Sequence, residues 1–178
     1  MFQNQIGANL AHGIPGELAF DGPLRGHPVL LASTDAETNV IGSVALFYNA
    51  AQDAVATDAT VGTGAFAGFL ANPKVYAWRG SVLGNAQDAP MTLPNGTIAE
   101  AVDEGTLFVM LTTAGNIGDQ IVASDTDGTL SAVAQGEAIP AGNRDTGARI
   151  VRYPVLEAGL AVIHAGAGFQ TVAAAGGV

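Results

Sequence analysis

The stretch from Thr97 to Ala132 constrains the fold of this chain most strongly, because strand and turn signals alternate along it at short intervals. Residues 97–102 alternate between apolar and polar side chains. Residues 106–113 form a run so apolar that it is typical of a strand buried on both faces. The sequence Asp103-Glu104-Gly105 between them predicts a turn.

The same stretch continues with two shorter strand signals, at residues 120–123 and 129–133. They are separated by Asp125-Thr126-Asp127-Gly128, a tight-turn sequence in which the glycine supplies the positive φ that hairpins require. Short strands at regular spacing predict an antiparallel meander. The fold class expected is therefore all-β, either a β-sandwich or a jelly-roll-like barrel, and not a helical or βαβ protein.

Further strands are predicted on both sides of this meander, and no internal repeat of fixed period accompanies them. The predicted segments are residues 29–31, 40–48, 65–70, 75–78, 91–93, 148–153 and 160–164. Residues 50–64 are predicted to form a loop or a short helix, and residues 134–146 a loop. The 178 residues are enough for one domain that buries a sizeable core without cross-links.

The first 28 residues differ from the rest, because glycine or proline interrupts them every few positions. Apolar side chains nevertheless recur along them like anchors, at Phe2, Ile6, Leu10, Ile14, Leu18, Phe20 and Leu24. We therefore expect an extended N-terminal arm over residues 1–28, which finds its hydrogen bonds on another surface, and a β-sandwich body over residues 29–178. A frayed terminus is the alternative.

The charge of the chain excludes several classes of partner. Its formal net charge is −10 and its six cations are scattered, so no basic face is available for nucleic acid or an anionic membrane. Residues 158–178 carry no charged side chain, but repeated glycines disfavour a membrane span, and no export signal is visible. The absence of cysteine excludes a disulfide scaffold and thiolate chemistry.

Motifs for catalysis or cofactor binding are not evident. No serine lies in a nucleophile-elbow sequence, and the three histidines are isolated from one another. Residues 62–67 match Gly-x-Gly-x-x-Ala, but neither a preceding strand nor a following helix is predicted there. A carboxylate pair for glycoside hydrolysis remains an alternative that the scarcity of aromatic residues disfavours. It would draw on Glu100, Asp103, Glu104 and Glu137. We therefore expect that the protein is not an enzyme and binds no cofactor.

Three aspartates suggest a calcium site as a further alternative, because hard cations collect carboxylates from loops. They are Asp119, Asp125 and Asp127. An EF-hand would need a carboxylate at position 123 and a glutamate further on, whereas Ala123 and Ala134 stand there. A hairpin turn explains Asp-x-Asp-Gly more simply, so no metal site is expected.

Three parts of the sequence are similar to known motifs of one family. Phe2-Gln3-Asn4-Gln5 matches a Phe-Gln-x-Gln opening. Residues 15–25 are similar to a Gly-Asp-Phe-Ala-x-x-Asn-Pro-Arg element, with Glu17 for the acidic residue, Leu18 for the aromatic one and Leu24 inserted before the arginine. Residues 69–94, from Phe69-Leu70-Ala71-Asn72 through Met91-Thr92-Leu93-Pro94, resemble a middle stretch rich in small residues and proline. The meander supplies Gly-Thr-Leu-Phe-Val, Gly-Asp-Gln-Ile-Val and Asp-Gly-Thr-Leu.

On these motifs the chain resembles the cement, or capsid-decoration, proteins of tailed bacteriophages. The resemblance implies a β-sandwich or jelly-roll-like body without a cofactor. It also implies a place on the outer capsid surface, contacts across neighbouring major capsid protein subunits, synthesis in the host cytoplasm, and a homo-oligomer, either dimer or trimer. It implies no catalytic residue. The predicted capsid contacts are Phe2, Gln3, Asn4, Gln5, Phe20, Pro23 and Arg25.

Among these contacts, Phe2 and Phe20 are expected to act as apolar anchors and Arg25 as a charged fork for a capsid carboxylate. The alternative function is a carbohydrate- or host-binding β-sandwich module displayed on a virion. That function would require an exposed aromatic patch, built from Trp78, Tyr76 or Tyr48.

Overall fold

The computed structural model describes residues 13–19, 22–35, 39–49, 53–57, 64–72 and 92–166. These residues form strands and turns and contain no helix, so no helix in them is long and apolar enough to cross a membrane. The strands are β1 (Arg25–Leu30), β2 (Ala45–Asn49), β3 (Ala54–Ala56), β4 (Phe66–Leu70), β5 (Ile98–Leu111), β6 (Gln120–Ser124), β7 (Leu130–Val133), β8 (Asn143–Arg152) and β9 (Gly159–Ala165). The predicted all-β class is confirmed.

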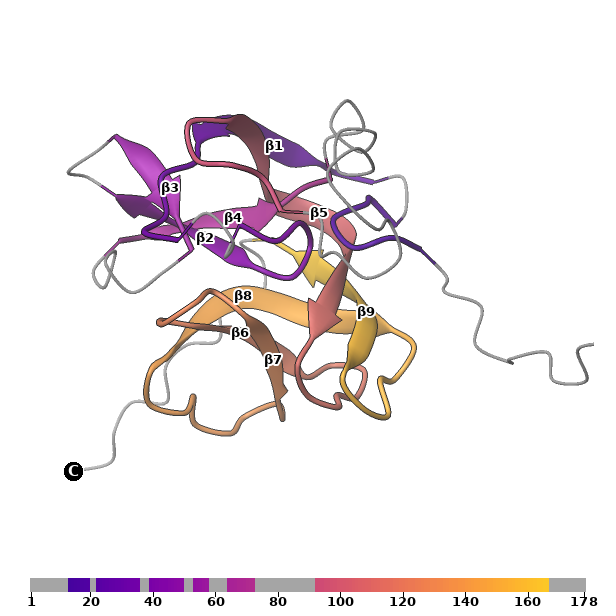
Figure 1. The fold of residues 1–178 in the computed structure, drawn as a ribbon. Coiled ribbons are helices and arrows are strands. Elements are labelled where there is room, and N and C mark those ends of the chain that lie inside the picture. Colours follow the sequence, from indigo (N-terminus) through magenta and orange to yellow (C-terminus); the bar gives the residue numbers. More distant parts are fainter. Residues whose placement is uncertain are drawn as a thin grey trace, which may run out of the picture.

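Strand β5 belongs to both halves of the fold. Its first half lies in an N-terminal sheet with the order β3-β2-β4-β5-β1, and its second half enters a C-terminal barrel. Figure 1 shows the two halves one above the other, with β5 descending from the upper sheet into the lower barrel. Antiparallel pairing with β1 covers residues 98–104, and antiparallel pairing with β9 covers residues 105–111.

The prediction of a turn at Asp103-Glu104-Gly105 is wrong, because β5 runs through these residues without a break. The backbone irregularity that the sequence signals is real but takes a different form. The register with β1 slips between Arg25 and Gly26, and Gly105 has a φ of +142°, outside the range that β-strand residues with a side chain adopt. The Asp-Glu-Gly sequence therefore marks a bulge at which one strand passes from one sheet to the next. We call residues 103–105 the kink.

The C-terminal barrel closes because β5 contacts strands at both ends of the series β7-β6-β8-β9. The barrel is a ring in which β5 pairs antiparallel with β9 and parallel with β7 at Leu111 and Leu130. This parallel contact corrects the prediction of a purely antiparallel meander. The hairpin of β6 and β7 is as predicted, and Gly128 at its turn has a φ of +68°.

Two apolar clusters correspond to the two halves. The N-terminal cluster includes Leu31, Leu46 and Leu70, together with Ala99 and Ala101 from the first half of β5. The second cluster fills the barrel and the space between the halves. It gathers Phe47, Phe69, Val102, Leu107, Val109, Ile121, Leu130, Ile150 and Ile163, among others. Strand β5 thus contributes side chains to both cores, and its apolar pattern is required along its full length.

Several strand boundaries differ from those predicted. Strand β2 begins at residue 45 and not at 40, because residues 41–43 form a turn around Gly42, whose φ is +67°. Strand β3 lies within a predicted loop. Strand β8 begins at Asn143, five residues before the predicted start at residue 148, since its first residues are polar and make side-chain contacts. The strand predicted at residues 75–78 lies outside the described residues.

Candidate functional site

Residues 13–19, the first described part of the N-terminal segment, lie along β5. The amide of Gly16 donates to the carbonyl of Phe108 at 2.7 Å, and the amide of Phe108 donates to the carbonyl of Glu17 at 2.9 Å. The amide of Ala19 donates to the carbonyl of Thr106 at 2.8 Å. Residues 16–19 and β1 thus follow β5 in the same antiparallel sense, and the boundary predicted between residues 28 and 29 falls within β1.

A close approach of backbones fixes the path of this segment. An ideal Cβ atom at Gly42 would lie 2.0 Å from the nitrogen of Gly16 and 2.3 Å from the carbonyl carbon of Pro15. Any residue larger than glycine would collide with them. On the other side, the amide of Asn72 donates to the carbonyl of Gly16 at 2.8 Å. The segment is held between β5, the turn at residue 42 and the end of β4.

The outer face of the segment is apolar. Ile14, Leu18 and Leu24 are 48%, 47% and 49% exposed. Leu18 and Leu24 also line a recess of about 490 Å³, which lies over the kink of β5. Its lining residues are Leu18, Ala19, Gly22, Pro23, Leu24, Gly105 and Thr106. We call the three exposed side chains and this recess the arm surface. Exposed apolar groups gathered beside a recess are characteristic of an interaction site.

Arg25 stands at the edge of the arm surface and is paired within its own chain. Its Nε lies 2.8 Å from one carboxylate oxygen of Asp103 and 2.9 Å from the other, and its Nη1 lies 3.6 Å from Glu104. The hydrogen bond and the charge of Asp103 raise the pKa of the Arg25 guanidinium above its usual value. The side chain is 57% exposed, so solvent screens this pairing.

The structure places two of the predicted contact residues, Pro23 and Arg25. Pro23 lines the recess, and Arg25 follows it at the start of β1. The other predicted contacts, Phe2, Gln3, Asn4, Gln5 and Phe20, lie outside the described residues. Sequence reasoning missed the contribution of Gly105 and Thr106, because it assigned them to a turn and a buried strand. The proline and glycine spacing before Arg25 was the available signal for the recess.

A glycan-binding module would need an exposed aromatic patch. Of the three aromatic residues predicted for it, the structure describes Tyr48, whose side chain already contacts His27. Its ring stacks on His27, with centroids 6.2 Å apart, and its hydroxyl lies 2.9 Å from Nε2 of the histidine. Tyr76 and Trp78 lie outside the described residues.

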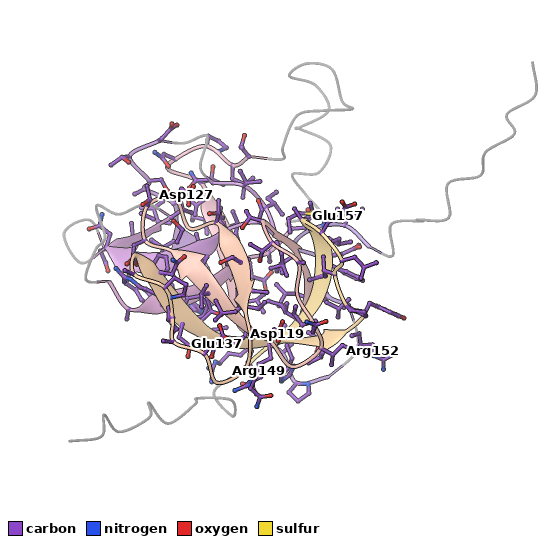
Figure 2. All side chains as sticks on the ribbon, turned by 90° about the horizontal axis from the view of Figure 1, so that it is seen from below. Asp119, Asp127, Glu137, Arg149, Arg152 and Glu157 are labelled. Atoms are coloured by element: carbon purple, nitrogen blue, oxygen red, sulfur yellow. The ribbon has the colours of Figure 1, made fainter. Side chains whose placement is uncertain are left out.

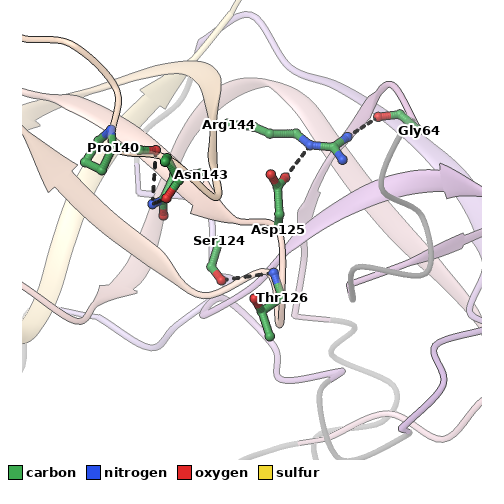
Figure 3. Close-up of polar contacts among 8 residues, drawn as sticks. Gly64, Ser124, Asp125, Thr126, Pro140, Asn143 and Arg144 are labelled. Atoms are coloured by element: carbon green, nitrogen blue, oxygen red, sulfur yellow. Dashed lines mark hydrogen bonds and ion pairs between the residues drawn. The ribbon is translucent and has the colours of Figure 1, made fainter.

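The three aspartates considered for calcium have separate partners. Asp119 accepts a hydrogen bond from the amide of Asn116, and Asp127 accepts two from Thr129. Asp125 pairs with Arg144, whose guanidinium also donates to the carbonyl of Gly64 (Figure 3). Among the described residues no group of three histidine, aspartate or glutamate side chains is arranged to hold a metal ion.

Arg144 joins the two halves of the fold. Its guanidinium carbon lies 4.8 Å from the centre of the Phe47 ring, a cation–π arrangement that connects β8 to β2. This cluster explains why polar residues open β8, and its role is structural.

Comparison with known proteins supports a single identification. No curated protein matches the sequence. A solved structure described as the capsid of Myoviridae phage XM1 has a similar fold, with a TM-score of 0.61 and 15% sequence identity over 92% of this chain and 96% of that one. The sequence itself matches the family described as structural cement protein (E217 gp24/Pam3 gp6) over residues 2–178. The chain therefore belongs to the phage structural cement protein family and is a virion structural protein.

Proposed function

We propose that this cement protein binds the outer surface of the capsid and bridges neighbouring major capsid protein subunits through its arm surface. The observation that carries the proposal is the row of half-exposed apolar side chains beside the recess at the kink. The segment that bears them is already hydrogen bonded to β5, so it presents them with little loss of backbone entropy on binding. No enzymatic activity is part of this function.

The contact energy of one copy is small under this proposal. Ile14, Leu18 and Leu24 each keep about half of their surface exposed, so burying the remainder contributes roughly 1 kcal/mol per side chain. A few kcal/mol per copy is a weak contact by itself. Copies repeated over a closed shell act with a high effective concentration, and a homo-oligomer, dimer or trimer, adds to this avidity.

The proposal assigns residues 1–12 to a direct capsid contact. In this proposal Phe2 to Gln5 pair as an extra strand with a sheet edge of the capsid protein. Main-chain hydrogen bonds then give affinity, and alternate side chains give register. Phe2 and Phe20 remain the proposed apolar anchors. Under this proposal the arm of residues 1–28 has two parts. Residues 1–12 bind the capsid, and the part that follows is attached to the body through the contacts of residues 13–19 and 22–28 with β5.

Arg25 keeps its proposed role as a fork for a capsid carboxylate, with one added step. Its guanidinium is paired with Asp103, so a capsid carboxylate must replace that partner or join it on the remaining nitrogen atoms. The Arg25 side chain is 57% exposed, so a second carboxylate can join it at a low desolvation cost. Bridging of subunits opposes the internal pressure of packaged DNA and needs no contact with the DNA. The net charge of −10 disfavours such a contact, because DNA is also negatively charged.

The test is cosedimentation of the purified protein with expanded, undecorated capsids. Wild type should bind saturably at a fixed ratio to the major capsid protein. Deletion of residues 1–12 leaves the bonds of residues 13–19 to β5 in place and should weaken binding severely, as should the double substitution Leu18→Asp and Leu24→Asp.

The control is Ile98→Asp, which places one of the two charges of the double variant on a side chain that is 66% exposed at the start of β5. It should bind like wild type. Binding of the deletion and of the double variant at wild-type strength would refute the proposal. If folded wild type fails to bind capsids at all, a glycan-binding module becomes the better hypothesis. Labelling of lysine or amine groups on intact virions tests whether the protein lies outside the shell.

A further inference from the structure

The loop of residues 94–97, which leads into β5, contains a pair of residues prone to spontaneous modification. Asn95-Gly96 is the one Asn-Gly pair in the sequence. An asparagine followed by glycine deamidates easily in a flexible chain, because glycine has no side chain to hinder the approach of its nitrogen to the asparagine amide. The loop is a tight turn, in which the amide of Thr97 donates to the carbonyl of Pro94 at 3.3 Å. Asn95 is exposed, so water reaches it.

Deamidation of such a pair needs no enzyme and proceeds through a five-membered ring. The backbone nitrogen of Gly96 gives its proton to hydroxide and attacks Cγ of Asn95, so that a new C–N bond forms. The side-chain nitrogen takes up a proton and leaves as ammonia. Water then opens the resulting succinimide at either carbonyl, which leaves an aspartate or an isoaspartate. Each product carries one negative charge that the asparagine lacks.

Both reacting groups are hydrogen bonded in the folded protein. The amide of Gly96 donates to the carbonyl of Leu31 at 2.8 Å. The side-chain nitrogen of Asn95 donates to the carbonyl of Ser33 at 2.6 Å, and its side-chain oxygen accepts from the amide of Ser33 at 3.1 Å and from Nδ2 of Asn39 at 2.9 Å. Attack would require the Gly96 nitrogen to leave its acceptor and the Asn95 amide to rotate. At least two hydrogen bonds must therefore break first.

The partners of Asn95 are anchored in the N-terminal half of the fold. Ser33 and Asn39 are buried, and the hydroxyl of Ser33 lies 3.2 Å from that of Thr57, which is also buried. Nδ2 of Asn39 donates to the carbonyl of Leu93 at 3.0 Å as well. These bonds connect the residues that follow β1 and β3 with those that precede β5. The loop of residues 94–97 therefore opens only when this buried polar network gives way.

A related pair in the described residues, Asp127-Gly128, lies at the turn between β6 and β7, where Figure 2 labels Asp127. An aspartate before glycine forms the same ring with loss of water. Here too both groups are hydrogen bonded, because the carboxylate accepts from Thr129 and the amide of Gly128 donates to the carbonyl of Ser124 at 2.9 Å. Isomerisation leaves the charge of Asp127 unchanged, whereas deamidation adds a charge at Asn95. The consequence for the fold is therefore specific to Asn95.

We propose that Asn95 is a deamidation site that the folded network protects and that reacts when the loop of residues 94–97 opens. The product opposes refolding. In an aspartate, a carboxylate oxygen replaces the amide nitrogen that donates to the carbonyl of Ser33 at 2.6 Å, so two acceptors face each other. An isoaspartate lengthens the backbone before Gly96, which displaces its bond to Leu31. The site is independent of the arm surface and lies beyond the proposed function.

The rate of deamidation tests the protection directly. Full-length protein is kept in mildly alkaline buffer, folded in one sample and unfolded in guanidinium chloride in another, and peptide mass spectrometry follows Asn95. Because at least two hydrogen bonds must break, the folded sample should react at least about tenfold more slowly. Gly96→Ala should slow the unfolded sample, since its methyl group hinders the attack. Equal rates in folded and unfolded wild type would overturn the inference.

Asn39→Ala and Arg144→Ala distinguish local opening from global unfolding. Both substitutions should reduce stability by a similar amount, but of the two side chains it is Asn39 that bonds to Asn95. Deamidation of the folded protein should rise at least about fivefold in Asn39→Ala, the effect of one lost hydrogen bond, and stay near the wild-type rate in Arg144→Ala. An equal rise in both variants would overturn the assignment of the protection to this network.

Asn95→Asp reproduces one product of the reaction and tests its effect on the fold. Its melting temperature should be lower than that of wild type by roughly 4–10 °C, because a donor to Ser33 is replaced by an acceptor. Asn143→Asp is the matched control, since Nδ2 of Asn143 lies 3.4 Å from each of its carbonyl acceptors and contributes little. It should melt close to wild type. A melting temperature of Asn95→Asp equal to that of Asn143→Asp would contradict the proposed effect on refolding.

Discussion

Replacement of Gly42 by alanine is the most informative single change, because it should detach the arm segment without altering any residue of the arm. The added Cβ atom would lie 2.0 Å from the nitrogen of Gly16, and ordinary contact begins near 3.4 Å. The segment must therefore retreat by 3.4 − 2.0 = 1.4 Å. Two hydrogen bonds of Gly16, of 2.7 Å to Phe108 and 2.8 Å from Asn72, then stretch to about 4 Å, beyond the usual limit.

The loss of unfolding free energy in Gly42→Ala has two parts. A φ of +67° in an alanine costs about 1–2 kcal/mol by itself. The two lost hydrogen bonds add about 1 kcal/mol each. The sum is about 3–4 kcal/mol, which for a chain of this length lowers the melting temperature by roughly 6–16 °C.

Gly136→Ala is the control that isolates the first part. Gly136 has a φ of +86°, and nothing lies within 4 Å of an added Cβ atom. It should therefore lose about 1–2 kcal/mol and no more. Stability is measured by urea unfolding followed by circular dichroism, and amide exchange over residues 13–19 is followed by mass spectrometry. Gly42→Ala should accelerate this exchange and Gly136→Ala should not. Equal stability losses and unchanged exchange would refute the docking of this segment through Gly42.

Three further predictions concern the body of the protein. Arg144→Ala should lose about 2–4 kcal/mol in urea unfolding, because the ion pair with Asp125 and the cation–π contact both disappear. Arg25→Ala, whose pair with Asp103 is largely exposed to solvent, should lose much less, and equal losses would contradict a role of Arg144 in joining the halves. Burial raises the pKa of Asp127, but hydrogen bonds from neighbouring hydroxyl and amide groups outweigh it and hold the pKa below its usual value. This carboxylate therefore stabilises the fold above a pH of about 4 and ceases to do so as the pH falls through its lowered pKa, so Asp127→Asn should show a shallower loss of unfolding free energy than wild type between about pH 5 and pH 3. Asn39 is fully buried, accepts one hydrogen bond and donates two, so Asn39→Ala should cost about 2–4 kcal/mol by thermal unfolding, and a loss below about 1 kcal/mol would show that its partners find replacements.

The fold class followed from local patterns, but the connection of the two halves did not. Alternation and apolar runs marked β5, β6, β7 and β9 because one or both faces of these strands are buried. At Asp103-Glu104-Gly105 the same residues serve a hairpin turn or a bulge equally well. The choice between them depends on whether partners such as β1 and β9 cover the strand on each side, which local sequence does not encode.

Polar strand ends were the other source of error. Residues 143–146 lack apolar alternation because Arg144 pairs with Asp125 and the hydroxyl of Thr146 donates to the carbonyl of Ile121 at 2.7 Å. Such contacts join residues distant in sequence and leave no periodic signal. The parallel contact of Leu111 with Leu130 was missed for the same reason.

The candidate site was predictable to the extent that it rests on segment composition. Glycine, proline and spaced apolar residues before Arg25 predicted a segment with surface contacts, and in the structure Pro23 lines the recess. The pairing of Arg25 with Asp103 was not predictable, because it depends on the slipped register of β1 against β5.

The sharing of β5 has a mechanical consequence. A tensile load that enters through β1 and leaves through β9 would run along the axis of β5. Six register pairs to β1 and seven to β9 flank it, so the load falls on these ladders in shear and the bonds must break together. A strand pulled from its end in an unzipping geometry would release one bond at a time. The two halves would therefore resist an expanding shell as one stiff unit, without a hinge between them.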